Sequence, residues 1–228
     1  MLAPYLITLH AEPTAADALL LIDGYTRVQR ASPSDFAHET LALQRAGWRG
    51  AIYALWWDSS SASDPLFQLL PPLHWHMVKE RAVDAGRNLE DQIISLISKR
   101  ISLVAFSLGA RVAYDGLLST DSIFKFHDLI LLGGAIQSNR EYWLGLISRL
   151  SGRLINCYHP SDPILDLLFR LGEFSPDYAC GQEPLGLDDQ RLYNLDASRL
   201  LARHGSDPHH SYWAALEDLL GAAGWLRA

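Results

Sequence analysis

Short apolar runs alternate along the chain with longer segments in which apolar residues recur at helical spacing. Residues 18–22 and 51–57 are continuous apolar runs that stop at Asp-Gly or at Asp and serines, a pattern typical of strands buried on both faces of a sheet. Between them, residues 33–46 open with Ser, Pro and Asp and continue with helical spacing. These three segments predict a strand, a helix and a second strand.

The same alternation continues to the end of the chain. The patterns predict further strands at 101–105, 129–132, 154–158 and 191–195, and helices at 79–99, 108–118, 140–150 and 212–220. Such an order produces a mostly parallel sheet with helices on both faces. We therefore predict a single α/β domain over residues 1–228, a length at which α/β folds commonly stay undivided.

Two stretches interrupt this rhythm. Residues 59–77 are rich in serine and then in leucine, proline and tryptophan, and residues 173–190 form a long loop. Long insertions in compact domains are often functional. We expect residues 59–77 to form a small cap or lid over a site, with simple core packing as the alternative.

The sharpest chemical signal follows the predicted strand at 101–105. Ser107 lies between Ala105 and Gly109, where the strand turns into a helix. This is the pattern of a nucleophile elbow, in which the serine hydroxyl stands above the sheet and its neighbours at two residues' distance must be small. Ser107 is therefore the candidate nucleophile, and an ordinary helix cap is the alternative.

A serine nucleophile needs a base and a carboxylate that orients the base, and in this kind of fold the acid follows the serine and precedes the histidine. Asp162 lies just after the predicted strand 154–158, at a carboxyl end where a site is expected. Asp162 is the candidate acid, although a turn or helix cap before Pro163 would also use an aspartate. Asp166 is a weaker choice because its spacing places it one turn into the next helix.

Three histidines near the end of the chain are candidates for the base. His209 and His210 lie at the start of the closing helix, and His204 lies in the loop before it. Adjacent residues at a helix start point in different directions, so position in the sequence does not choose between His209 and His210.

Two backbone N–H groups are candidates for an oxyanion hole. One belongs to Leu108, directly after the serine, and the other to Tyr25, in the loop Asp23-Gly24-Tyr25 after the first predicted strand. We expect Gly24 to allow the close turn that this loop needs, with strand termination as its alternative role.

Composition and charge narrow the class of protein. The 228 residues include 19 Lys and Arg against 26 Asp and Glu, a formal charge of −7, whereas nucleic-acid binders carry a basic surplus. The longest apolar stretches fall short of the roughly 20 residues that a membrane-spanning helix needs, and the amino terminus lacks the positive start of a secretory signal. We expect a cytoplasmic protein with no transmembrane segment and no nucleic-acid partner.

The remaining candidate ligands point to no metal or cofactor. His74 and His76 have no third ligand at suitable spacing, and Gly133-Gly134 lacks a phosphate-binding pattern. Cys157 and Cys180 cannot form a disulfide framework. We therefore predict two free thiols.

Three motifs taken together, at 107–111, 156–162 and 209–213, resemble those of serine hydrolases of the α/β-hydrolase superfamily. More narrowly, they resemble the group typified by the transmembrane and coiled-coil domain proteins, to which residues 53–58 are also similar. The His-x-x-Tyr pattern of that group favours His209 over His210. The chain departs from the group because it has no membrane-spanning stretch.

The resemblance implies an α/β-hydrolase fold and esterase, lipase or related acyl-transfer chemistry. We expect a serine hydrolase that cleaves an acyl ester of a small-molecule or lipid-like substrate without a metal or organic cofactor. The alternative function is that of a catalytically inactive binding or scaffold protein with the same fold.

Overall fold

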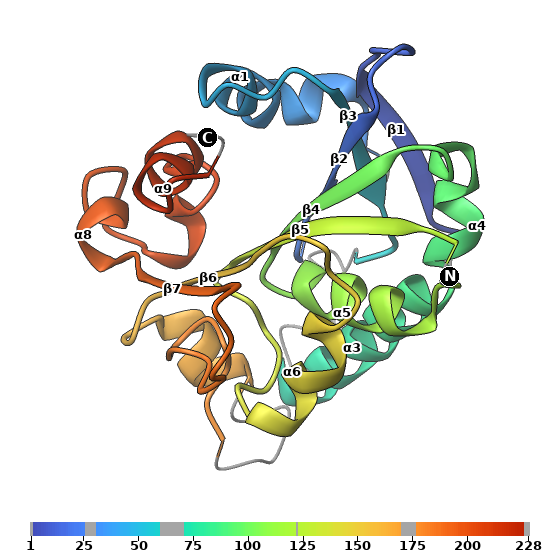
Figure 1. Cartoon of the computed structure of the whole chain (residues 1–228). Helices are drawn as coiled ribbons and strands as arrows, with labels where there is room; N and C mark the ends of the chain where they lie inside the picture. Colours follow the sequence, from blue (N-terminus) through green and yellow to red (C-terminus); the bar gives the residue numbers. More distant parts are fainter. Residues whose placement is uncertain (1, 26–30, 60–70, 122, 170–176, 226–228) are drawn as a thin grey trace.

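A computed structural model describes residues 2–25, 31–59, 71–121, 123–169 and 177–225. Its seven strands form one sheet in the order β1-β3-β2-β4-β5-β6-β7 (Figure 1). Only the edge strand β1 runs antiparallel to its neighbour, and the other pairs are parallel. The predicted α/β class and the mostly parallel sheet are confirmed.

The strands are β1 (Tyr5–His10), β2 (Asp17–Ile22), β3 (Ala51–Trp56), β4 (Arg100–Phe106), β5 (Lys125–Leu132), β6 (Leu154–Tyr158) and β7 (Leu192–Asp196). The α-helices are α1 (Ala37–Arg45), α3 (Pro71–Arg87), α4 (Leu89–Ile93), α5 (Gly109–Ser119), α6 (Arg140–Ile147), α8 (Ser198–Leu201) and α9 (Leu216–Ala222). Shorter helical turns lie at Pro33–Phe36, Ile94–Leu96, Leu165–Phe169 and His209–Ser211.

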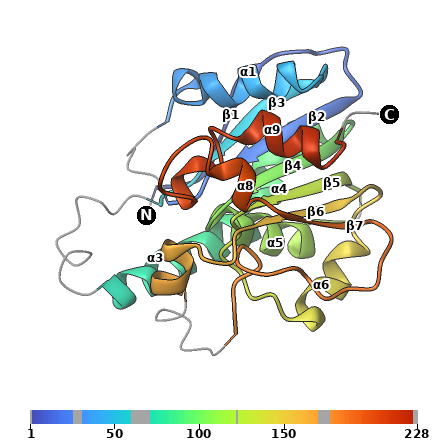
Figure 2. The same cartoon turned by 90° about the vertical axis from the view of Figure 1, so that its left-hand side faces the viewer.

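Helices cover both faces of the sheet. Figures 1 and 2 show α1, α8 and α9 on one face and α3, α5 and α6 on the other. Neighbouring residues of β5 alternate between the two cores: Leu129 and Leu131 pack on the side of α3 and α5, and Ile130 and Leu132 on the side of α1 and α9. The central strands are continuously apolar because each side chain, whichever way it points, meets a layer of helices.

The structure differs from the predicted elements at several places. Strand β1 was not predicted, although its residues Tyr-Leu-Ile-Thr-Leu-His are mainly apolar, because it is a short edge strand whose antiparallel partner β3 lies more than 40 positions further along the chain. The predicted helix 79–99 begins earlier, at Pro71, and breaks after Arg87 into α3 and α4. The closing helix α9 begins only at Leu216, after a turn at His209–Ser211.

The predicted cap at residues 59–77 lies mainly outside the described residues. Of this stretch, residues 71–77 form the first turns of α3 and Ser59 is buried after β3. The cap over residues 60–70 and the single-domain organisation remain predictions.

The order of the strands makes the carboxyl end of β2 a topological switch point. The chain leaves β2 for β3 on one side and returns to β4 on the other, so β2 lies between them. Ile22 at the end of β2 pairs with Ala105 near the end of β4. In parallel α/β sheets, sites form at the carboxyl ends of strands where the direction of winding reverses.

Candidate active site

Ser107 follows the last residue of β4 in a strained backbone conformation. Its φ is 52°, and among the described residues no other non-glycine residue has a positive φ. Its N–H donates to the main-chain oxygen of Leu132 at 3.0 Å, and its carbonyl accepts from the N–H groups of Ala135 at 2.9 Å and Ala110 at 3.1 Å. These bonds join the end of β5 to the start of α5 and hold the serine in the turn.

The small residues around Ser107 have a steric explanation. A Cβ atom at Gly109 would lie 2.3 Å from the main-chain oxygen of Ile22 and 2.7 Å from that of Asp23. Ala105 is fully buried and pairs with Ile22 on one side and Leu131 on the other. Therefore α5 can begin directly against the end of β2 only because the residue two after the serine has no side chain.

Three side chains from distant parts of the chain form a hydrogen-bonded series. Nε2 of His209 lies 3.0 Å from Oγ of Ser107, and Nδ1 of His209 lies 2.7 Å from Oδ2 of Asp162. All three are buried, with exposed fractions of 3%, 4% and 0% for Ser107, His209 and Asp162. A carboxylate can only accept, so Nδ1 of His209 is the donor to Asp162, and in a neutral imidazole Nε2 is then the acceptor that faces the serine hydroxyl.

Asp162 is held rigidly by the backbone that follows it. Its Oδ1 accepts from the N–H groups of Ile164 at 3.0 Å and Leu165 at 3.1 Å, which leaves Oδ2 for the histidine. The turn-capping role and the contact with His209 therefore coexist in one side chain. Asp166 is exposed one turn further on.

The other two candidate histidines are bound elsewhere. Nδ1 of His210 lies 2.8 Å from Oδ2 of Asp207, and Nε2 of His204 lies 3.0 Å from Oδ2 of Asp218. His210 is exposed, whereas its neighbour His209 is buried. The turn at His209–Ser211 points the two rings in different directions, with an angle of 83° between their planes.

The loop after β2 passes directly beside the serine. A Cβ atom at Gly24 would lie 2.7 Å from Cβ of Ser107 and 2.9 Å from the main-chain oxygen of Phe106. Gly24 does not have a positive φ, so it is needed for space and not for the close turn that the sequence led us to expect. Tyr25 follows in this loop, and Leu108 caps the start of α5, where backbone N–H groups favour negative charge.

Sequence reasoning named Asp23 only as part of this loop and missed its contacts. Oδ1 of Asp23 accepts from the N–H of Gly24 at 2.7 Å and from Nε1 of Trp213 at 3.0 Å. Its main-chain oxygen accepts from Nε1 of Trp57 at 2.8 Å. Burial raises the pKa of the Asp23 carboxyl, and the bonds from Trp213 and Gly24 oppose part of that rise. No spacing rule links positions 23 and 213, so no local signal could have joined them.

Aromatic packing supports the turn that carries His209. The ring of Phe106 lies 5.0 Å from that of His209, 6.0 Å from that of Tyr212 and 5.7 Å from that of Trp213, measured between centroids. Gly133 has a φ of 51°, and a Cβ atom there would lie 2.7 Å from the Tyr212 ring. Close packing against the turn therefore accounts for this glycine.

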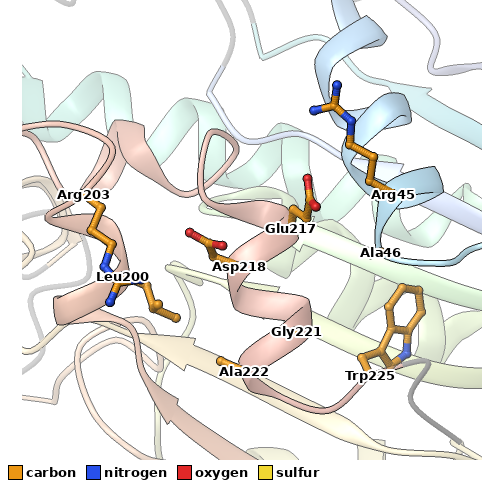
Figure 3. A pocket seen from close by; sticks show the side chains of 9 residues that line it. All are labelled: Arg45, Ala46, Leu200, Arg203, Glu217, Asp218, Gly221, Ala222 and Trp225. Atoms are coloured by element: carbon orange, nitrogen blue, oxygen red, sulfur yellow. The ribbon is translucent and has the colours of Figure 1, made fainter.

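Metal-ligand candidates and the pocket beside α9 lie outside the group formed by Ser107, His209 and Asp162. Within the ranges described above, no group of three or more His, Cys, Asp and Glu side chains is placed to hold a metal ion. His76 is exposed beside the buried Trp75. A pocket of about 530 Å³ is lined by nine residues from α1, α8, α9 and their ends, among them Arg45 and Asp218 (Figure 3). None of these residues belongs to the series around Ser107.

Curated relatives match the chain over part of their length. The chain is 29% identical over 157 residues to an uncharacterized membrane protein of Caenorhabditis elegans, and 28% identical over 152 residues to the transmembrane and coiled-coil domain-containing protein STS1 of Oryza sativa subsp. japonica. These matches cover 66% and 64% of the chain but 24% and 22% of the relatives, so the chain spans about a quarter of their length. A probable lipase of Saccharomyces cerevisiae, MIL1, is 33% identical over 101 residues, or 42% of the chain and 9% of that protein.

These relatives are named membrane or transmembrane proteins. Their names contradict the expected cytoplasmic location and the expected lack of a transmembrane segment. The expectation was wrong because the charge and hydropathy of a globular domain carry no information on the membrane segments of proteins that contain such a domain. Over the described residues, we find no helix that combines the length and the apolar character needed to cross a bilayer.

Solved structures identify the fold of the chain, and a family model identifies its protein family. Lipase B of Aspergillus fumigatus superposes with a TM-score of 0.53 at 11% identity, over 99% of the chain and 56% of the lipase. A lipase-esterase related protein of Clostridium acetobutylicum superposes with a TM-score of 0.50 at 11% identity, over 99% of both chains. At this identity the likeness establishes an α/β-hydrolase fold and nothing finer. The family model described as a protein of unknown function (DUF726) matches residues 71–225, more than half of the sequence, and the chain therefore belongs to that family.

Proposed function

We propose that the protein is a serine hydrolase that cleaves an acyl ester through a covalent acyl-enzyme. Ser107 is the nucleophile, His209 the general base and acid, and Asp162 the residue that orients the imidazole. The N–H groups of Tyr25 and Leu108 form the oxyanion hole. The proposal is carried by one observation, the series Ser107 Oγ, His209 and Asp162 with contacts of 3.0 and 2.7 Å, in which the serine has the strained φ of 52°.

In the first half of the reaction, Oγ of Ser107 attacks the ester carbonyl while its proton passes to Nε2 of His209. Negative charge develops on the carbonyl oxygen, which accepts hydrogen bonds from the N–H groups of Tyr25 and Leu108. When the tetrahedral intermediate collapses, the bond to the alcohol oxygen breaks and that oxygen takes the proton from Nε2. An acyl ester on Ser107 remains.

In the second half, water attacks the acyl carbon and gives a proton to Nε2 of His209. The second tetrahedral intermediate collapses, the bond to Oγ breaks, and Ser107 regains its proton from the histidine. The product is a carboxylic acid. Asp162 stabilises the imidazolium in both halves because its Oδ2 accepts from Nδ1, and its fixed Oδ1 prevents rotation of the carboxylate.

Labelling with a fluorophosphonate tests the proposal directly, because only an activated serine displaces fluoride from this probe. We expect mass spectrometry to locate the adduct on Ser107 in the native protein, and no adduct in Ser107→Ala. His209→Gln is expected to slow labelling by roughly 10⁴-fold or more. His210→Gln is the matched control, because His210 is the adjacent residue and bonds to Asp207 on the surface.

The alternative, a binding protein without catalysis, makes the opposite prediction. Absence of labelling in folded protein, both with and without detergent, would contradict the hydrolase and favour that alternative. Where labelling occurs, p-nitrophenyl esters of increasing acyl length identify the preferred substrate class, and a relative named a probable lipase makes longer acyl chains the first to test. Added alcohols that capture the acyl group would reveal transfer in place of hydrolysis.

A further inference from the structure

We propose that Asp23 is a positioning residue, whose carboxyl oxygen sets the oxyanion loop and the turn bearing His209 at a fixed separation. The effect of Asp23 on catalysis rests on the proposed function, because that proposal gives Tyr25 and His209 their roles. The contact itself is a property of the fold and can be measured without turnover.

The carboxyl group of Asp23 joins two segments that lie 190 positions apart in the chain. Its Oδ1 accepts from the N–H of Gly24, the residue before Tyr25, at 2.7 Å, and from Nε1 of Trp213 at 3.0 Å. Trp213 lies four residues after His209, which is about one helical turn. A single oxygen atom therefore accepts one bond from the loop beside the nucleophile and one from the turn that holds the base.

Asp23 can serve as a fixed reference point because its own backbone is held on two sides. Its main-chain oxygen accepts from Nε1 of Trp57, just after β3, at 2.8 Å. On the other side, α5 begins so close that a Cβ atom at Gly109 would lie 2.7 Å from the same oxygen. The backbone of Asp23 is thus bound to the residue just after β3 and packed against the start of α5.

Trp213 is also held from both ends. Its indole N–H is bound to Asp23, and its ring packs edge-on against Phe106, with a centroid distance of 5.7 Å and an angle of 60°. Phe106 also contacts the ring of His209, with a centroid distance of 5.0 Å. A shift of the Trp213 indole is therefore transmitted to the imidazole through one shared aromatic ring.

The contact requires an acceptor oxygen and not a negative charge. Both donors are neutral N–H groups, and burial disfavours the charged form of the Asp23 carboxyl. Asparagine keeps an acceptor oxygen at the same place, so Asp23→Asn is the conservative variant. Asp23→Ala removes the oxygen, and Trp213→Phe removes one donor while retaining the ring packing.

A second aspartate–tryptophan pair on the same sheet supplies the matched control. Oδ2 of Asp128 accepts from Nε1 of Trp225 at 2.8 Å, and its Oδ1 accepts from the N–H of Arg153 at 2.7 Å. Asp128 lies in the first half of β5, away from the carboxyl ends of the strands. Asp128→Ala and Trp225→Phe therefore remove the same kind of bond without touching the candidate site.

The test uses the full chain and two measurements on each folded variant. The first is the NMR signal of the His209 ring protons together with the backbone N–H signal of Tyr25. The second is the rate of fluorophosphonate labelling of Ser107. We expect Asp23→Ala and Trp213→Phe to shift the signals of both residues and to slow labelling by roughly 10- to 100-fold, the effect of a displacement of about 1 Å. Asp23→Asn is expected to restore most of the rate, and the Asp128 and Trp225 variants to change only the melting temperature.

The outcomes separate this inference from the proposed function. If Asp23→Ala leaves the signals of His209 and Tyr25 as unaffected as Asp128→Ala does, the positioning role is overturned, whatever the labelling rate of the native protein. If those signals shift but native Ser107 is never labelled, the contact between the two segments stands and the hydrolase proposal fails. If Asp23→Asn labels as slowly as Asp23→Ala, the charge matters and the acceptor argument is wrong.

Discussion

Ser107 and Gly24 show how single residues create the candidate site. A serine held at a positive φ costs of the order of 1–3 kcal/mol, and it persists because hydrogen bonds from two neighbouring elements fix its peptide groups. Gly24 contributes by having no side chain. The loop that carries Tyr25 can approach Ser107 only because nothing projects into the space beside Cβ of Ser107.

Substituting Gly24 tests this argument. In Gly24→Ala the new Cβ atom would lie 2.7 Å from Cβ of Ser107, so the loop must move away from the nucleophile. We expect labelling or ester hydrolysis to fall by roughly 100- to 1000-fold, the effect of losing one oxyanion donor. Gly186→Ala is the control because a Cβ atom there meets nothing within 4 Å; equal activities of the two variants would refute the steric argument.

At the scale of elements, α3 and α5 pack with unusually close backbones. A Cβ atom at Gly86 of α3 would lie 2.8 Å from Cβ of Asp115 and 2.8 Å from the main-chain oxygen of Val112. A Cβ atom at Gly116 of α5 would lie 3.3 Å from the main-chain oxygen of Gly86, and 2.4 Å from Cδ2 of Leu89 in α4. These contacts hold α5, the helix that begins just after Ser107, against α3 and α4, so the two glycines help to fix the position of the candidate site.

The packing predicts opposite effects for two glycine-to-alanine changes within helices. Gly86→Ala should lower the free energy of unfolding by about 1–3 kcal/mol, because overpacking outweighs the better helix propensity of alanine. Gly145→Ala in α6 should raise it by about 0.5–1 kcal/mol, since Gly145 is exposed and its nearest contact would be Leu118 at 4.0 Å. Urea unfolding of both variants measures the difference, and a neutral or stabilising Gly86→Ala would contradict the close packing.

At the scale of the whole molecule, the reactivity of the two cysteines measures the opening of the cores on the two faces of the sheet. The predicted free thiols are confirmed, and both are buried: Cys157 in the core beside α1 and α9, and Cys180 in the core beside α3 and α5. Burial raises the pKa of each thiol to about 12. Since the thiolate is the reactive form, neither cysteine should react in the native protein.

Alkylation with iodoacetamide at pH 8 measures this. We expect no modification of Cys157 or Cys180 under native conditions, and complete modification of both in urea. Across the unfolding transition the two thiols should become reactive together, because both cores are built on one sheet. Modification of only one thiol at low urea would show that one helical layer opens by itself.

The fold class and the chain order of the site residues could be predicted from the sequence because both leave local patterns in it. Buried parallel strands need unbroken apolar runs, and the nucleophile elbow needs small residues at two positions, so both leave local patterns at 101–105 and around Ser107. The edge strand β1 was missed although residues 5–9 are mainly apolar, because its place at the edge of the sheet follows only from its pairing with β3.

By itself, the sequence determined the α/β class, the strand-to-helix turn at Ser107 and the chain order of serine, aspartate and histidine, because each follows from periodicity or from steric needs within a few residues. The resemblance favoured His209 over His210 through the His-x-x-Tyr pattern, but only the tertiary structure shows that the His209 ring meets Ser107 while the His210 ring meets Asp207. It alone brought Asp23 to Trp213, because a contact across 190 positions is made by folding of the whole sheet and leaves no trace in local spacing.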